Sequence, residues 1–213
     1  MTTTSARSGT GGPAAHPAGF LAAPELDEHV QQMYDGDLDA QGYIAELTKV
    51  WAWSPGALAA LSHAMAVAVD MGGLDMPTRS LLVTAAASAM GDSYCTLAWG
   101  SKLVRYAGDV TTARIVAGDD GALTAEGRAL AGWARRVARD PSSLQVADVD
   151  ELRAAGLDDQ KIFAVTLFVA LRVAFSTVND ALGAAPDHEL VARVPVALRD
   201  AVDFGRLPLT PRG

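Results

Sequence analysis

The sequence predicts an all-α protein, and three observations support this fold class. From Glu25 onward, apolar residues recur at helical spacing along most of the chain. The alternation of β-branched and aromatic residues that is typical of strands does not occur in the sequence. Residues that begin helices, and glycines that end them, recur at intervals of roughly 8 to 20 residues. A chain of 213 residues can bury a sizeable core in one domain.

The first half of the chain contains the signals for three consecutive helices. Ser54 supplies a capping hydroxyl for the first helix, and Pro55 occupies its first helical position. A Met-Pro pair begins the second helix and Gly91 ends it, after which either Asp92 or Ser93 caps the third. The expected helices run from Ser54-Pro55 to Gly72-Gly73, from Thr78 to about Met90, and from Asp92 or Ser93 to Gly108.

The second half of the chain contains the signals for three further helices. Thr124 begins the first of them, and it stops at Asp140, because a residue that precedes proline disfavours α geometry. Asp158 caps the last and longest helix, and Gly183 closes it. The expected helices run from Thr124 to Asp140, from Val146 to Ala155, and from Asp158 to Leu182.

The longest predicted helix is apolar almost all round between Ile162 and Phe175, where mainly Thr166 and Arg172 break the pattern. Such a helix is either the buried central element of a bundle or the seam of an oligomer. Burial of all its faces is expected to need a second subunit. Arg172 and Asn179 are expected to be buried polar groups that form hydrogen bonds or ion pairs across subunits rather than take part in catalysis.

Composition divides the chain into one domain and two tails. Residues 1–19 are rich in Thr, Ser, Gly, Pro and Ala and have no periodic large apolar residues, which predicts a disordered or draped tail. Residues 20–208 are expected to form a single helical domain, and residues 209–213 a C-terminal tail.

Composition also disfavours several classes of function. A net charge of −8 and a pI near 4.9 argue against nucleic-acid binding, which needs clustered Lys and Arg. No apolar run reaches the roughly 18 to 20 residues that span a bilayer, and the N-terminal segment lacks the apolar core of a secretory signal. The sequence therefore predicts a cytoplasmic protein with no membrane partner. Four scattered histidines and one cysteine show no metal-ligand spacing, and no nucleotide, haem or flavin signature is visible, so no metal or cofactor is expected.

The single cysteine, Cys95, is the first candidate for chemistry. With Asp92 as the capping residue, Cys95 falls at the third helical position, where free backbone amides and the helix dipole favour a thiolate. The nearby Asp92 carboxylate has the opposite effect and raises the pKa of the thiol. Because no His, Lys or Arg stands beside Cys95, the sequence leaves open whether it is reactive or an inert buried side chain. Asp92 is either a general acid or base or a solvated capping residue.

Two segments around this cysteine, Thr78–Leu82 and Ser93–Gly100, resemble without gaps the signature region of the carboxymuconolactone decarboxylase and alkylhydroperoxidase D-like superfamily. The likeness covers about Phe20 to Pro208, and segments outside the motif resemble its peroxidase-related branch. These segments are Gly42-Tyr43-Ile44, Trp53-Ser54-Pro55, 138–143, 147–153, 156–159 and 180–183. The resemblance implies an alkylhydroperoxidase D-like helical bundle that assembles as dimers or trimers of dimers, with the thiol site near subunit contacts.

Members of this superfamily typically carry a glutamate early in one helix, a Cys-x-x-Cys pair opening the next, and a histidine four residues after the second cysteine. By this resemblance, Cys95 matches the second cysteine, which peroxidase members oxidise to a sulfenic acid. Asp92 stands in place of the resolving cysteine, Trp99 in place of the histidine, and Ser80 in place of the glutamate. The resemblance therefore implies a peroxidase-type site that lacks its proton relay and its second thiol.

The candidate catalytic residues are Cys95 and Asp92, and the candidate substrate-binding residues are Trp99, Tyr94, Ser80 and His63. Trp99 adds a large apolar face one turn after the thiol, and it could either plug the pocket or stack on a flat ligand. The Tyr94 hydroxyl could enter the same space or serve only in packing. His63 could face the site, although a lone helix histidine is more often a core or surface residue.

Two classes of function follow from these residues. The first is an oxidoreductase-type, peroxidase-related enzyme that acts on a small organic substrate through one cysteine and an external reductant. The second is a redox-inactive member of the superfamily. It would either use Asp92 in a decarboxylation, isomerisation or elimination, or be a silent subunit of a homo-oligomer or of an assembly with a paralogue. If Trp99 lines an open cavity beside Cys95, an enzymatic role is favoured, whereas a silent subunit needs no such access route and Trp99 could fill the cavity.

Overall fold

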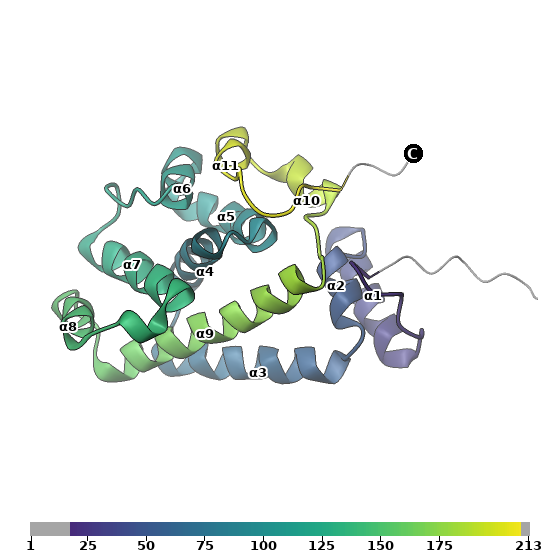
Figure 1. Cartoon of the computed structure of the whole chain (residues 1–213), viewed down its shortest axis with the longest axis horizontal. Coiled ribbons are helices and arrows are strands. Elements are labelled where there is room, and N and C mark those ends of the chain that lie inside the picture. Colours follow the sequence, from purple (N-terminus) through teal and green to yellow (C-terminus); the bar gives the residue numbers. More distant parts are fainter. Residues whose placement is uncertain (1–17, 210–213) are drawn as a thin grey trace, which may run out of the picture.

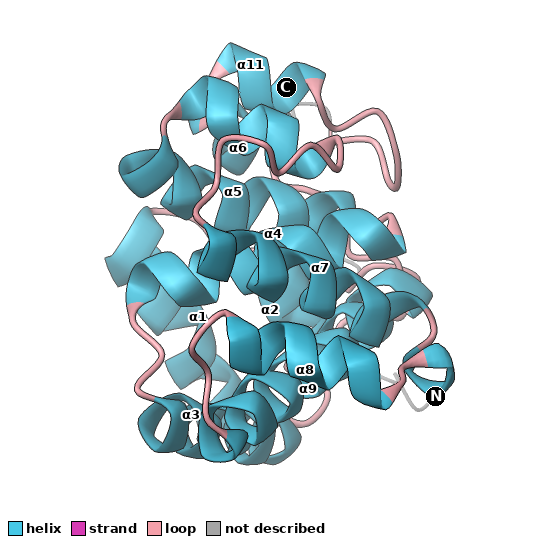
Figure 2. Cartoon of the chain, turned by 90° about the vertical axis from the view of Figure 1, so that its left-hand side faces the viewer, coloured by secondary structure: helices cyan, strands magenta, loops and turns pink. Residues whose placement is uncertain are grey.

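The computed structural model describes residues 18–209, and every regular element within that range is a helix (Figure 1; Figure 2). The elements are α1 (Glu28–Gln41), α2 (Glu46–Trp51), α3 (Pro55–Gly72), α4 (Met76–Met90), α5 (Ser93–Ala107), α6 (Asp109–Val116), α7 (Ala125–Arg139), the 3₁₀ turn η1 (Pro141–Ser143), α8 (Val146–Ala154), α9 (Asp159–Ala181), α10 (His188–Arg193) and α11 (Val196–Asp200). The prediction of an all-α fold is confirmed.

The bundle is centred on α4, which packs mainly against α5 and α7 and also contacts α9. The two longest helices, α3 and α9, lie side by side and run in opposite directions along one edge of the molecule (Figure 1). The short helices α10 and α11 lie over α5 and α6. The turn between α4 and α5, which contains the signature residues, is therefore close to both the centre of the bundle and the C-terminal part of the chain.

The predicted capping residues begin the helices as expected. The Ser54 hydroxyl accepts a hydrogen bond from the Ala57 amide at the start of α3, and Pro55 is the first residue of that helix. Gly91 ends α4 with a φ of 80°, a left-handed conformation that favours glycine. The six predicted helices are all present, with bounds that differ from the expected ones by two residues or fewer.

Five short or peripheral helices, α1, α2, α6, α10 and α11, were not separately predicted from the sequence. The clearest case is α6, which follows α5 directly. Gly108 breaks the helix with φ 81° and ψ 162°, and its carbonyl accepts a hydrogen bond from the Thr112 hydroxyl at 2.7 Å. Gly108 therefore ends α5 and also begins α6. In a sequence, a glycine after a helix indicates that the helix ends there, but it does not indicate that a new helix begins.

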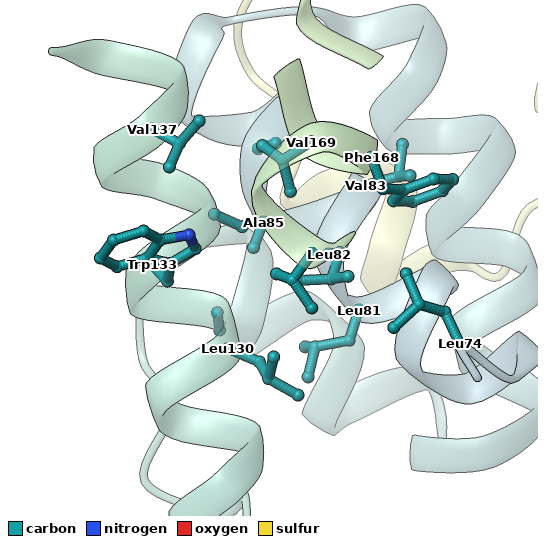
Figure 3. Close-up of a cluster of buried hydrophobic side chains, with 14 of the residues drawn as sticks. Leu74, Leu81, Leu82, Val83, Ala85, Leu130, Trp133, Val137, Phe168 and Val169 are labelled. Atoms are coloured by element: carbon teal, nitrogen blue, oxygen red, sulfur yellow. The ribbon is translucent and has the colours of Figure 1, made fainter. Parts of the chain in front are cut away.

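The largest hydrophobic core surrounds α4 (Figure 3). Its labelled members on α4, α7 and α9 are Leu81, Leu82, Val83, Ala85, Leu130, Trp133, Val137, Phe168 and Val169. The indole N–H of Trp133 donates to the Thr166 hydroxyl at 3.0 Å, so the buried indole has its polar group satisfied. This core holds α4 and α9 in fixed positions, and both of these helices carry residues of the site.

The long apolar helix α9 is only partly buried within one chain. Phe168 and Val169 belong to the core, whereas Phe163 is 60% exposed. By length and composition, α9 is the one helix among residues 18–209 that could cross a bilayer, but half of its most apolar stretch is buried inside the bundle, as in the core helix of a globular protein. The expectation that a second subunit covers its outer face remains a prediction.

Most of the two expected tails lies outside the described residues. This holds for residues 1–17 of the N-terminal tail (1–19) and for residues 210–213 of the C-terminal tail (209–213). Ala18 is fully buried, and the Phe20 amide donates to the Leu182 carbonyl at 2.8 Å. The chain is thus packed against the end of α9 from Ala18 onward, which is two residues earlier than the expected start of the domain.

The C-terminal segment, residues 203–209, crosses the start of α5. The Ser93 hydroxyl donates to the Arg206 carbonyl at 2.8 Å. Gly205 has a φ of 74°, and a Cβ atom at this position would lie 2.4 Å from the Gly91 carbonyl oxygen, so only glycine allows this close approach. The segment therefore contacts the residues on both sides of Asp92.

Candidate functional site

Asp92 lies in the turn between α4 and α5 and caps α5. Its Oδ1 accepts a hydrogen bond from the Cys95 amide at 2.9 Å, and its carbonyl accepts one from the Thr96 hydroxyl at 2.6 Å. The side chain is fully buried, and Oδ2 has no hydrogen-bond partner in the part of the chain that the structure describes. The predicted cap is confirmed, but the alternative of a solvated carboxylate is wrong, because the turn is enclosed by the C-terminal segment and α9.

Cys95, in the first turn of α5, is 1% exposed and contacts a cation from a distant helix. The Arg172 guanidinium of α9 donates to Sγ, with Nη2 at 3.5 Å from the sulfur. The sequence signal for Arg172 was its position as the one charge in a long apolar run, but sequence analysis could not place it beside Cys95. The contacts shown for Arg172 lie within one chain, whereas a partner in another subunit had been expected.

Burial raises the pKa of the Cys95 thiol to about 12, and the Asp92 carboxylate adds to this effect. The Arg172 guanidinium and a hydrogen bond from Ser176 act in the opposite direction but do not outweigh burial. The helix dipole and the arginine therefore fail to produce a thiolate. At neutral pH, Cys95 is a protonated, solvent-inaccessible thiol.

Aromatic side chains fix the position of the Arg172 guanidinium. Its central carbon lies 5.0 Å from the centroid of the Trp99 ring and 4.6 Å from that of the Phe175 ring, within the range of cation–π contacts. Phe175 in turn stacks on Trp51, with centroids 5.2 Å apart and ring planes 8° apart. The Trp51 indole donates to Asn179 at 2.8 Å. Asn179, like Arg172, has contacts within the chain.

A cavity of about 490 Å³ lies on the outer side of Trp99 and Arg172. Its lining residues are Ser62, Met65, Ala66, Val69 and Asp70 of α3, Arg79 of α4, Trp99 of α5, and Phe168 and Arg172 of α9. Neither Cys95 nor Asp92 belongs to this lining. Trp99 thus lines an open cavity instead of filling it, and it stands with Arg172 between that cavity and the buried thiol.

The other candidate substrate-binding residues do not line this cavity. The Tyr94 hydroxyl donates to Asp187, whose second carboxylate oxygen accepts the Glu46 amide at 2.9 Å, so Tyr94 serves in a buried hydrogen-bond network. Ser80 is fully buried, and its hydroxyl has no partner among residues 18–209. His63 is exposed on α3 outside the lining. Of the four candidates, only Trp99 lies where a small molecule could contact it.

A half-buried carboxylate, Asp180 of α9, lies close enough to Asp92 for the two charges to interact. The pKa of Asp180 is raised to about 6, mainly by partial burial and to a smaller extent by repulsion from the Asp92 carboxylate. The positive charge of Arg206 lowers this pKa but does not cancel the two effects. The Arg206 guanidinium donates to the Asp180 carbonyl at 2.6 Å and so holds the C-terminal segment against α9. At neutral pH, ionised Asp180 destabilises the fold.

We expect Asp180→Asn to stabilise the protein at pH 7.5 and to have no such effect at about pH 3. A carboxyl group whose pKa is higher in the folded than in the unfolded state stabilises the fold fully only below its unfolded pKa. For Asp180, this stabilisation is lost as the pH rises through the folded pKa of about 6. Because the group is only half buried, the expected gain is about 1 kcal/mol. Urea unfolding at the two pH values measures it. Asp200→Asn, an exposed change, is the control, and an equal effect of Asp180→Asn at both pH values would contradict the assignment.

The described residues contain no group of three or more His, Cys, Asp or Glu side chains that could hold a metal ion. The polar groups near the cavity are instead hydroxyl, guanidinium, ammonium and carboxylate groups. Such a set can bind a small molecule by charge and hydrogen bonding. In the geometry observed, it offers no thiolate and no histidine for proton transfer.

This arrangement of helices is similar to that of two solved bacterial proteins. One is an uncharacterized peroxidase-related protein of Ralstonia eutropha JMP134, described as an alkylhydroperoxidase AhpD core, with a TM-score of 0.69 and 22% identity over 85% of this chain and 100% of that one. The other, an uncharacterized peroxidase-related protein of Silicibacter sp. TM1040, has a TM-score of 0.69 and 20% identity over 84% of this chain and 97% of that one. No family model and no curated protein matches the sequence. The chain therefore has the alkylhydroperoxidase D-like fold that the resemblance predicted.

Proposed function

We propose that this chain, whose helices have the arrangement of the alkylhydroperoxidase AhpD core, is a redox-inactive member of that superfamily that binds a small organic molecule in the cavity beside Trp99 and Arg172. The observation that carries the proposal is the position of Cys95. The thiol is 1% exposed, and it lies outside the cavity where a substrate could enter.

The chemistry of thiol peroxidases supports this proposal. Peroxide reduction needs a thiolate that attacks oxygen, a proton for the departing oxygen, and a second thiol that clears the sulfenic acid. Burial and Asp92 raise the pKa of Cys95 to about 12, so the first requirement is not met at neutral pH. Trp99 occupies the place of the histidine, and the chain has no second cysteine. Asp92 is also separated from the cavity, so an acid–base reaction that depends on it gains no support.

A one-cysteine peroxidase is the second candidate, and one observation favours it. The Arg172 guanidinium lies 3.5 Å from Sγ and would stabilise a thiolate if peroxide reached the sulfur. This function would require an opening between the cavity and Cys95 and an external reductant. A direct assay of peroxide consumption separates the two candidates.

In that assay, dithiothreitol is the reductant in every sample. The wild-type protein and Cys95→Ser are both expected to consume hydrogen peroxide and an organic hydroperoxide no faster than buffer that contains dithiothreitol but no protein. Serine keeps the size and the buried position of the side chain and removes the sulfur, so any thiol-dependent rate must disappear. Faster consumption by the wild type than by Cys95→Ser would overturn the proposal and support the one-cysteine peroxidase.

We also propose that the protein is cytoplasmic and forms a homo-oligomer through the outer face of α9. Phe163, which is 60% exposed, and the exposed Ala170 and Ala174 lie along one face of this helix. Apolar residues gathered on one face of a bundle are typical of contact surfaces between subunits. Assembly with a paralogue is the alternative, and both arrangements are compatible with a binding role.

A further inference from the structure

We infer that the cavity beside Trp99 and Arg172 takes a small organic carboxylate, with its charged group near Arg79, Lys102 and Arg172 and its apolar body against Met65, Val69 and Phe168. This inference rests on the proposed function, in which the cavity binds a small molecule, and it specifies the chemical class of that molecule.

Three cations beside the cavity lack a partner of opposite charge. Arg79 and Arg172 line the cavity, and the Lys102 ammonium lies 4.0 Å from the centroid of the Trp99 ring, which also lines it. Within residues 18–209, none of the three forms an ion pair with Asp or Glu. Burial, together with the positive charges of Arg172 and Arg79, lowers the pKa of Lys102. The cations therefore repel one another, and a bound anion would relieve this repulsion.

Arg172 is the most deeply buried of the three cations. It is 8% exposed, and the contacts of its guanidinium within residues 18–209 are the Cys95 sulfur and the rings of Trp99 and Phe175, none of which carries a negative charge. A buried cation without a counter-charge costs free energy, and a carboxylate in the cavity that Arg172 lines would supply that charge. The guanidinium also presents several donors in a fixed plane, a geometry that suits a carboxylate.

The rest of the cavity determines what the anion is attached to. Met65, Val69 and Phe168 provide an apolar wall, which an inorganic anion would leave without a partner. A volume of about 490 Å³ is in the range of small-molecule sites, which is roughly 300 to 1,000 Å³. One carboxylate, Asp70, also lines the cavity, but it is exposed, and the lining contains two cations, Arg79 and Arg172. The lining thus favours an organic anion over a neutral molecule or phosphate.

Trp99 has a different role here from the stacking that the sequence suggested. Lys102 and Arg172 both lie over its ring, at 4.0 and 5.0 Å from the centroid. These contacts hold the two cations in place by cation–π attraction. Trp99 therefore positions the groups that bind the anion, in addition to forming part of the cavity wall.

Isothermal titration calorimetry on the full chain in low-salt buffer tests the inference, with benzoate, its neutral isostere benzamide, and inorganic phosphate as probes. We expect benzoate to bind at least about tenfold more tightly than benzamide or phosphate, because each charge-assisted hydrogen bond that benzamide lacks is worth about a factor of ten or more. Arg79→Gln and Lys102→Gln should each weaken benzoate binding about fivefold, because both side chains are partly exposed. Arg199→Gln, on α11, is the control and should leave it unchanged.

Two matched variants on α3 locate the site. Ala66 lines the cavity and Ala59 is exposed on the same helix outside it, so Ala66→Trp should abolish benzoate binding and Ala59→Trp should not. Equal binding of benzamide and benzoate would overturn the carboxylate class and leave the cavity as a site for neutral molecules. Tight phosphate binding would overturn the organic class. Benzoate binding that survives Ala66→Trp, or no binding at all, would overturn the inference. The redox part of the proposed function is decided separately by the peroxide assay.

Discussion

At pH 8, Cys95 in the native protein is expected to react with iodoacetamide at least about a thousandfold more slowly than Cys95 in the unfolded chain. Only the thiolate reacts, and the native pKa of about 12 lies far above the unperturbed value of about 8.5. This difference alone lowers the thiolate fraction by more than a factor of about 1,000, and burial of the sulfur slows the reaction further. Mass spectrometry of timed samples, with and without guanidinium chloride, measures both rates.

The pH dependence of the same reaction provides the control. The unfolded rate should level off above about pH 9.5, where an ordinary cysteine is fully ionised, whereas the native rate should still be rising at pH 10. A native rate within tenfold of the unfolded rate at pH 8 would show an accessible thiolate. It would mean that Arg172 prevails over burial and Asp92, and it would revive the peroxidase hypothesis.

The second large effect is expected at Trp51, which supports the site from behind. Trp51→Ala should reduce the free energy of unfolding by about 3 to 5 kcal/mol, as is typical for truncation of a buried aromatic side chain. Trp51 is 8% exposed, stacks on Phe175 and donates to Asn179 at 2.8 Å. Its removal leaves a cavity, an unpaired buried amide, and a less constrained ring beside Arg172. Urea unfolding monitored by circular dichroism measures the loss.

The nearby Trp53 offers a matched comparison. It is 53% exposed, and its indole donates to the Ala22 carbonyl at 3.1 Å. Trp53→Ala should therefore cost less than about 1 kcal/mol. Equal losses for the two variants would show that Trp51 has no special role in the packing around Arg172, and the assignment of a supporting role to the Trp51–Phe175 stack would be wrong.

The parts of the structure that depend on local chemistry could be predicted from the sequence. Ser54, Asp92 and Thr124 cap the helices that they were expected to cap, because a capping hydrogen bond joins residues three positions apart. The same locality explains why the proximity of Asp92 to Cys95 could be predicted. By contrast, α6 was missed, because its start shares Gly108 with the end of α5.

The parts of the site that depend on packing between distant helices could not be predicted. Arg172 and Cys95 are 77 positions apart in sequence, and only the packing of α9 in the bundle brings the guanidinium to the sulfur. The sequence left two roles open for Trp99, and neither included the two cations over its ring. Side chains such as Tyr94 and His63 were plausible candidates by spacing, but their directions depend on how the helices rotate against their neighbours.

Residues 203–209 have a consequence for the order in which the structure forms. Ser93 and Arg206 are 113 positions apart, yet the hydrogen bond between them helps to close the turn that holds Asp92. A contact across so many residues closes a long loop, which costs more conformational entropy than the local hydrogen bond from the Cys95 amide to Asp92. We therefore expect the cap of α5 to form early in folding and residues 203–209 to pack over it late.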